Sequence, residues 1–487
     1  MKLAVVVPSA RTWTWHRVLV DSLREKHDVE IFVAVSSPYP RALRQFLRLE
    51  RRVAGPVRLA EMLQPQSAWP SAASRAALVP ADFDLVIDLA ERSGESDMAL
   101  RLTFDGMDND LYLFGKLLAG LSPVLAVTAS GAEIVSSYPA IEDREVLLRA
   151  LTAVFARMIA LVQRAVEWRA GAVRIPAADA DDRQPRRYSV SALAQFAARE
   201  VRIKAVRQLI KRSWRENHWL LAMAGEKRHD EFLVLDSIAP VERPATSYFA
   251  DPFLYAANGK RYLFAEEFPY DTRRGVIVCA ALDAQQRPGP FQRVLERPYH
   301  LSYPFVFEYE GVHYMMPETS RNGTVELYRA VEFPISWEID TVLMSNIVLA
   351  DATLLRRDGL WWMFGAVRSF GGSSQDELFA FYSRDLHGPW NAHPQNPLVS
   401  DARCARPAGR FLEREGRLFR PAQDCDAGYG TAIVWSEILE LTPETFRERR
   451  IARWPGTIAG PYSGLHTYDS LDGLAVIDLK QRHVRKA

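Results

Sequence analysis

The sequence predicts a multidomain protein, with an N-terminal α/β domain of the Rossmann-like class followed by an all-β five-bladed β-propeller. Three observations support this fold class. The 487 residues are too many for one ordinary hydrophobic core. Residues 1–170 alternate between strand-like and helix-like patterns, which is typical of a mainly parallel sheet. From Trp219 onward the pattern is almost entirely that of short apolar strands.

The N-terminal region begins with a continuous apolar run at residues 3–7, followed by a helix-like segment at 15–25 and a strand at 29–35. Further buried strands are predicted at residues 83–89 and 123–128. Ligands of such sheets bind beyond the carboxyl ends of the strands. No GxGxxG follows the first strand and no GxxxxGK[ST] occurs in the chain, so no phosphate-binding motif supports a nucleotide there.

A linker and a basic helix are predicted between the two domains. Residues 171–190 are rich in Pro, Asp and Arg, and residues 191–216 interleave seven basic side chains with apolar ones and Trp214. The predicted boundaries are therefore 1–170 for the α/β domain, 171–216 for the linker and helix, and 217–487 for the propeller. We favour a helix whose apolar stripe packs on the propeller. Peripheral contact with an anionic membrane surface through residues 191–216 is the alternative.

Five hairpins in the second half of the chain share one pattern, an apolar strand, a turn that ends in Gly, and a second apolar strand. The turns end at Gly259, Gly311, Gly359, Gly416 and Gly473. Strand repeats of roughly 40–50 residues are the signature of a β-propeller. Because the last hairpin is close to the C-terminus, we expect the strands near residues 219–237 to complete its blade and close the ring.

Counting from the turn glycines selects a candidate site. Eight residues before them lie Asp251, Tyr303 and Asp351, and seven residues after them lie Glu266, Glu318 and Gln423. The innermost strands of a propeller line its axis, so these positions should meet at one mouth of the central channel. The predicted neighbours there are Glu267, Arg406, Asp424 and His466. Arg406 and His466 join the site only if the register shifts in the fourth and fifth blades, where the same counting gives Ala408 and Leu465.

Carboxylates gathered at a propeller mouth are suited to carbohydrate chemistry. One carboxyl group can act as an acid or base while another stabilises positive charge at the sugar carbon. We assign such catalytic roles to Asp251, Glu318 and Asp351, and substrate binding to the other selected residues. Arg406 is a partner for these carboxylates or for a phosphate. The histidines lack zinc-ligand spacing, so no metal site is assigned, and a divalent cation held by oxygen ligands is left open.

Composition narrows the class of protein and its surroundings. Apolar content of 48%, charged content of 25% and a net charge of +1 fit a globular protein without a nucleic-acid partner. Three cysteines cannot form a disulfide framework and predict reduced thiols. No uninterrupted apolar stretch approaches the roughly 20 residues of a membrane span. We therefore expect a cytoplasmic protein, with peripheral contact at the inner face of the membrane left open by the basic helix.

The propeller region resembles a known family. The ordered strings SYFADPFLY, YLFAEE, LSYPFVFEYEG, YMMPET, DATLL, WWMF, GPWNAHPQNPLVSDARCARPAG and RPAQDC are similar to the propeller domain at the N-terminal side of plant glucosamine inositolphosphorylceramide transferases and to domains of bacterial polysaccharide-locus proteins. They also resemble, more distantly, five-bladed glycoside hydrolases of the arabinanase and fructosidase type. That likeness implies a base or nucleophile at Asp251, a second Asp at Asp351 and an acid at Glu318. Arg406 stands where some hydrolases carry an acidic residue, which speaks against simple hydrolysis. Residues 1–170 weakly resemble a formyltransferase-type domain but lack its HPSLLP-like loop.

The sequence thus favours a carbohydrate-active enzyme, with glycosyl transfer in surface polysaccharide or glycolipid biosynthesis as the first hypothesis. Its substrates would be a carbohydrate or glycolipid and a nucleotide-sugar donor, the donor bound by the α/β domain. A non-catalytic glycan-binding or scaffold propeller is one alternative. A glycoside hydrolase-like or formyltransferase-related sugar-modifying enzyme is the other.

Overall fold

The computed structural model describes residues 1–63, 69, 73–74, 78–90, 99–170, 183–210, 214–229 and 232–485. The chain forms two compact units, one of Met1–Val206 with Ser369–Ser373, and one of Arg207–Arg368 with Ser374–Ala487. Residues 171–182, the first part of the predicted linker, lie outside the described residues. The fold class is confirmed in both units.

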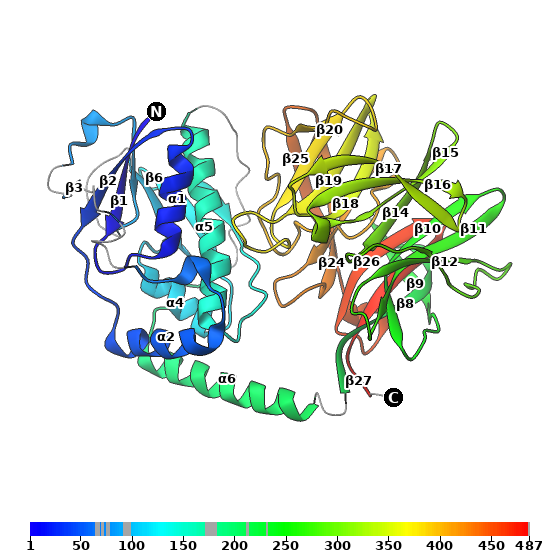
Figure 1. The fold of residues 1–487 in the computed structure, drawn as a ribbon, viewed down its shortest axis with the longest axis horizontal. Coiled ribbons are helices and arrows are strands. Elements are labelled where there is room, and N and C mark those ends of the chain that lie inside the picture. The colour runs from blue at the N-terminus through cyan, green and yellow to red at the C-terminus, as the bar shows by residue number, and fades with distance from the viewer. Residues whose placement is uncertain are drawn as a thin grey trace. The chain divides into compact units, whose positions relative to one another are not determined.

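The N-terminal unit is built on a seven-stranded sheet of order β3-β2-β1-β4-β5-β6-β7 (Figure 1). Its strands are β1 Lys2–Pro8, β2 Asp28–Ala34, β3 Ala73–Ser74, β4 Leu85–Asp88, β5 Ala99–Phe104, β6 Leu125–Ala129 and β7 Ala132–Ser137. The strands β3, β2, β1, β4 and β5 pair in parallel, and β6 and β7 add antiparallel pairs at one edge. The strand β1 lies inside the sheet, and its apolar residues Leu3 to Val7 are therefore all fully buried.

The helices of this unit are α1 Thr14–Arg24, α2 Arg41–Ala54, α4 Asp110–Leu118, α5 Leu147–Arg169 and α6 Val190–Ile210. Short 3-10 turns occur at Arg58–Ala60 and Pro80–Asp82, and in the propeller at Ser320–Asn322 and Gly456–Ala459. The predicted helix over 191–216 is too long at its end, because Trp214 already pairs with Arg485 in a β-ladder. Pairing in the sheet outweighs local helix propensity there. Within the described part of the chain, no helix has the length and apolarity required to cross a membrane.

The second unit consists of five four-stranded antiparallel sheets. The first blade contains β10 Ser247–Ala257, β11 Lys260–Pro269, β12 Val276–Ala281 and β13 Gln292–Leu295. The second contains β14 Ser302–Tyr309, β15 Val312–Glu318, β16 Thr324–Glu332 and β17 Ser336–Ser345. The third contains β18 Leu349–Arg357, β19 Leu360–Val367, β20 Leu378–Ser383 and β21 Asn391–Ala392. The fourth contains β22 Leu412–Arg414, β23 Arg417–Asp424, β24 Ala432–Leu441 and β25 Phe446–Pro455.

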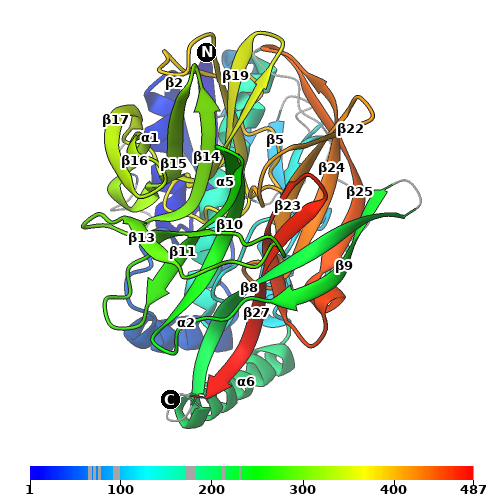
Figure 2. The ribbon, with the colours of Figure 1, turned by 90° about the vertical axis from the view of Figure 1, so that its right-hand side faces the viewer.

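The fifth blade joins the two ends of the domain. It combines β26 Gly464–Leu471 and β27 Leu474–Arg485 with β8 Trp214–His229 and β9 Phe232–Pro240, in the order β26-β27-β8-β9. Figure 2 shows β8 in green beside β27 in red, where the ladder runs from Leu474 opposite Gly225 to Arg485 opposite Trp214. The prediction that strands near 219–237 complete the last blade is confirmed, and this ladder closes the ring.

The five predicted turns share one backbone geometry. Each places two successive residues in the left-handed region, for example Asn258 at φ 52° followed by Gly259 at φ 72°. Two left-handed residues define a type I′ turn, whose twist matches that of the flanking strands. The glycine pattern of the sequence therefore reports a specific turn type, and this explains why it marks every blade.

Candidate active site at the propeller axis

The site is organised by equivalent bulges in the first three blades. The innermost ladder is interrupted at Asp251, Tyr303 and Asp351, whose φ angles are 49°, 47° and 53°. Left-handed backbone at residues other than glycine is uncommon and costs on the order of 1–3 kcal/mol unless the surroundings hold it. The three residues are those that counting from the turn glycines selects. The structure therefore places them at equivalent positions of successive blades.

Each bulge turns a backbone N–H away from the ladder and toward a carboxylate of the preceding blade. The N–H of Asp251 donates to Oδ2 of Asp478 at 3.0 Å, and the N–H of Tyr303 donates to Oδ2 of Asp251 at 3.2 Å. The N–H of Asp351 donates to Oε2 of Glu318 at 3.1 Å. Carboxylates thus satisfy buried donors that would otherwise lack partners. This sequence of contacts joins the fifth, first, second and third blades around the axis.

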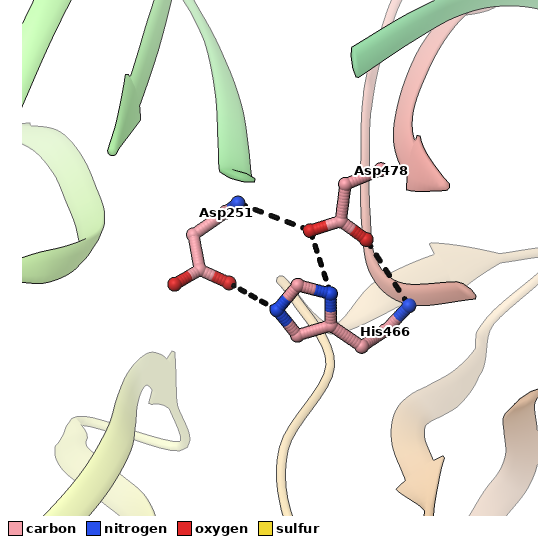
Figure 3. A group of neighbouring side chains, drawn as sticks. All are labelled: Asp251, His466 and Asp478. Atoms are coloured by element: carbon pink, nitrogen blue, oxygen red, sulfur yellow. Dashed lines mark hydrogen bonds and ion pairs between the residues drawn. The ribbon is translucent and has the colours of Figure 1, made fainter. Parts of the chain in front are cut away.

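Asp251, His466 and Asp478 form a buried charged cluster (Figure 3). Nε2 of His466 lies 3.0 Å from Oδ1 of Asp251, and its Nδ1 lies 2.8 Å from Oδ2 of Asp478. Thr467 also donates its hydroxyl to Oδ1 of Asp251 at 2.8 Å. Burial alone would lower the pKa of His466, but the charges of Asp478 and Asp251 raise that pKa to about 10. His466 is therefore an imidazolium held between two carboxylates.

The same cluster offers ligand atoms that all lie within 4.8 Å of one another, which is close enough for a metal ion. Both ring nitrogens of His466 already face carboxylate oxygens, as Figure 3 shows. A metal ion needs a free lone pair on one of those nitrogens. The geometry fits an imidazolium that supplies the positive charge itself.

Asp351 and Arg406 form a second buried pair. Nε of Arg406 lies 2.6 Å from Oδ2 of Asp351 and its Nη2 lies 3.1 Å from Oδ1, a bidentate arrangement. Nε2 of Gln423 donates to the same Oδ2 at 2.7 Å. Burial raises the pKa of Asp351, and the charge of Arg406 opposes that rise. Glu318 lies 3.5 Å from Nη2 of Arg406 and keeps 10% of its side chain exposed.

Glu266 differs from these carboxylates because its charge is not compensated. Its residue is only 5% exposed. Its Oε1 has no hydrogen-bond partner among the residues that the structure describes. Nε2 of His300 lies 3.5 Å from that oxygen. Burial, reinforced by the charge of Asp251, raises the pKa of Glu266 well above its ordinary value. By contrast, burial would raise the pKa of Asp251, but the charge of His466 and the hydrogen bonds from His466 and Thr467 together lower that pKa. Two neighbouring carboxyl groups thus have pKa values pushed apart, which is how enzymes separate an acid from a base.

The remaining predicted residues have different placements. Glu267 follows Glu266 in β11 and so points to the opposite face, where it accepts a hydrogen bond from Ser247 at 2.8 Å. Asp424 is next to Gln423 and pairs with Nε of Arg453 at 2.9 Å. The ring of Tyr303 is fully buried, and its hydroxyl accepts a hydrogen bond from the N–H of Gly409 at 2.8 Å.

Sequence reasoning missed Asp478, Thr467, His300 and Tyr429. Asp478 lies five residues after Gly473 in β27, on the same face as the counted position at Lys480. The alternation of side chains along a strand could have found it. Tyr429 stacks under the guanidinium of Arg406, whose Cζ lies 5.0 Å from the ring centroid. It comes from the loop between β23 and β24, which the repeat pattern does not reach.

Comparisons with known proteins point to the propeller. Residues 233–458 match the family described as "Glucosamine inositolphosphorylceramide transferase 1, N-terminal". The transferase of that name from Oryza sativa subsp. japonica is 39% identical over 220 residues, covering 44% of this chain and 29% of the relative. The one from Arabidopsis thaliana is 38% identical over 207 residues, covering 42% and 27%. The chain thus spans less than a third of the length of these curated relatives.

Solved structures include the RS223 β-xylosidase, with 13% identity, a TM-score of 0.37, and coverage of 46% of this chain and 82% of that one. An α-L-arabinanase of Cellvibrio cellulosa, complexed with arabinohexaose, has 12% identity and a TM-score of 0.37, covering 49% and 93%. The resemblance predicted from the sequence is confirmed by the family match. Residues 233–458 are similar to the N-terminal domain of glucosamine inositolphosphorylceramide transferases.

Proposed function

We propose that the propeller is the catalytic domain of an enzyme that transfers a glycosyl group during glycolipid or surface polysaccharide biosynthesis. One observation carries this proposal: Glu266 is a buried carboxyl group with a raised pKa, next to the charged cluster of Asp251. Acid–base catalysis at a sugar uses a neutral carboxylic acid next to ionised carboxylates. The similarity to proteins named as transferases supports the reaction class.

In this proposal Glu266 donates its proton to the oxygen of the leaving group as the bond to the sugar carbon breaks. The acceptor hydroxyl attacks that carbon and gives its proton to Glu318, whose side chain is the more exposed of the two. Asp251 and Asp351 stabilise the positive charge that develops on the sugar. Arg406 remains bound to Asp351 and directs its remaining N–H groups to an anionic part of the donor.

The experiment compares Glu266→Gln with Glu267→Gln. The raised pKa of Glu266 favours its neutral form, which the amide matches in charge and size while lacking the acidic proton. Glu267 is the adjacent residue on the opposite face and serves as the matched control. Wild-type protein is incubated with a panel of nucleotide-linked sugars and glycolipid acceptors, and products are detected by mass spectrometry. We expect Glu266→Gln to lose roughly 10²–10⁴-fold in rate, and Glu267→Gln to retain activity. Full activity in Glu266→Gln would show that Glu266 is not the general acid.

A second candidate is a glycan-binding propeller without turnover. The observation in its favour is that Asp251 and Asp351 each accept several hydrogen bonds from the protein and so help to hold the blades together. This function predicts saturable glycan binding to the wild type, with no product from any donor in the panel. The same panel therefore distinguishes the two functions.

A further inference from the structure

The N-terminal domain contains a cavity at the point where its strand order reverses. The cavity is lined by Pro8 at the end of β1 and by Asp88 and Leu89 at the end of β4. These strands are neighbours in the sheet, and the chain continues from them to opposite edges. In open parallel sheets, ligands bind beyond the carboxyl ends of the strands at this switch point. The place is therefore one where a ligand site is expected on topological grounds.

Aromatic side chains form part of the walls of the cavity. Phe155 lies 5.4 Å from Trp13 and stacks on Trp15 at 5.6 Å, measured between ring centroids. The ring of Tyr39 lies 6.0 Å from that of Trp13 and meets Phe114 edge to face at 5.1 Å. The cavity encloses about 50 Å³. A single water needs roughly 10–15 Å³ on this scale. The space therefore suits one small ring better than a fused pair of rings.

His16 contributes a hydrogen-bond donor to this cavity. It lines the cavity and is 3% exposed. Its Nδ1 accepts a hydrogen bond from the N–H of Trp13 at 3.0 Å, which is shorter than the 3.3 Å to the carbonyl oxygen of Trp13. Burial lowers the pKa of His16 to about 3, so the ring is neutral and carries its proton on Nε2. No hydrogen bond is formed by Nε2 within the part of the chain that the structure describes. A ligand in the cavity can supply an acceptor for this N–H group.

Two of the charged residues that line the cavity, Arg11 and Asp110, form an ion pair with each other. Nη1 of Arg11 pairs with Oδ1 of Asp110 at 2.8 Å, and its Nε donates to the carbonyl oxygen of Ser37 at 2.7 Å. The hydroxyl of Tyr39 donates to the other oxygen of Asp110. The sequence between β1 and α1, SARTW, has no glycine that would let a phosphate approach the backbone. These features favour an uncharged ligand over an anionic one.

We propose that this cavity binds an uncharged, single-ring heteroaromatic molecule whose carbonyl oxygen accepts a hydrogen bond from Nε2 of His16. The aromatic side chains supply the apolar surface for the ring. A pyrimidine nucleoside and a pyridine amide such as nicotinamide share this chemistry. The site lies within the N-terminal domain and does not depend on the function proposed for the propeller.

The proposal is tested by calorimetric titration of the full-length protein with uridine, nicotinamide and, as a fused-ring comparison, adenosine. The first two probes distinguish the two sources of the ring. His16→Asn is the informative variant, because its amide oxygen can still accept from the N–H of Trp13 while the second ring N–H is gone. His387→Asn, on the exposed surface of the propeller, is the control. Losing one hydrogen bond of about 1.4 kcal/mol corresponds to a tenfold change in Kd.

We expect saturable binding of one single-ring probe, about tenfold weaker in His16→Asn and unchanged in His387→Asn. The proposal is overturned if neither single-ring probe binds at millimolar concentration, if adenosine binds at least as tightly, or if His16→Asn binds like the wild type. If His16→Asn does not fold, Leu102→Phe provides a second test. Leu102 lines the cavity, and the added ring should fill it and abolish binding. Retained binding in that folded variant would also contradict the proposal.

Discussion

The imidazolium of His466 predicts a pH dependence of propeller stability whose size follows from the structure. The pKa of His466 rises from an ordinary value of 6.5 to about 10 because Asp478 and Asp251 flank its ring. Each pH unit between those values corresponds to 1.36 kcal/mol, so the whole rise corresponds to about 5 kcal/mol. Since the folded protein holds the extra proton, this stability is fully present below pH 6.5 and is lost as the pH increases toward 10.

The assay is urea-induced unfolding of the full-length protein at several values between about pH 6 and about pH 10, followed by tryptophan fluorescence. Cysteine, tyrosine and lysine side chains also lose protons in this range. The quantity to compare is therefore the difference between the wild type and His466→Gln, which cannot carry the proton. We expect the free energy of unfolding of the wild type to fall by about 1.4 kcal/mol per pH unit more steeply than that of the variant.

The same variant should already be less stable at neutral pH, since Asp251 and Asp478 would face each other without a positive charge. His387→Gln, with a side chain 44% exposed, is the control and should follow the wild type. Equal slopes for the wild type and His466→Gln would refute the reasoning. So would an NMR titration in which the imidazole of His466 loses its proton below pH 7.

Three further predictions concern the packing around the axis. Asp351→Asn should lower the free energy of unfolding by about 3–5 kcal/mol because Arg406 loses its buried counter-charge. Asp358→Asn, in the exposed turn of the same hairpin, should change it little in the same urea experiment. Gly275→Ala should cost about 1–3 kcal/mol, because the added Cβ would lie 2.5 Å from Oε1 of Glu266 and 2.3 Å from the carbonyl oxygen of Leu301. Gly225→Ala, with 3.6 Å to the nearest atom, should unfold like the wild type, and equal losses for both glycines would contradict this account. Removal of residues 474–487 should abolish the cooperative unfolding transition of the propeller, because β26 and β8 both lose their partner; retention of that transition would show that the ring does not need closure.

The sequence predicted the architecture because turn chemistry is local. A type I′ turn needs two left-handed residues, and in these hairpins they are Asn-Gly, Asp-Gly or Glu-Gly pairs. Once five such turns define the blades, the positions of Asp251, Tyr303 and Asp351 follow by counting. Their shared bulge could not be predicted, because it depends on acceptors in other blades that capture the displaced N–H groups.

The site was harder to predict than the fold for two physical reasons. Strand alternation separates neighbours in sequence, so Glu266 lies at the axis while Glu267 lies on the opposite face. Register shifts also change which residues are found by counting from the turn glycines. The ladder of β26 is interrupted between Leu465 and Tyr468, and this shift places His466 at the axis. The positive charge of His466 also depends on Asp478, which lies beside the imidazole only when β26 and β27 are paired in the fifth blade.

The closure of the fifth blade has a consequence for how the protein is made. Because β8 and β9 are synthesised before the other four blades and β26 and β27 after them, the edge of β8 that pairs with β27 stays unpaired until residues 474–485 have been synthesised. An unpaired strand edge is a template for aggregation. A ribosome that stalls before residue 474 therefore releases a propeller in which this edge of β8 has no partner strand.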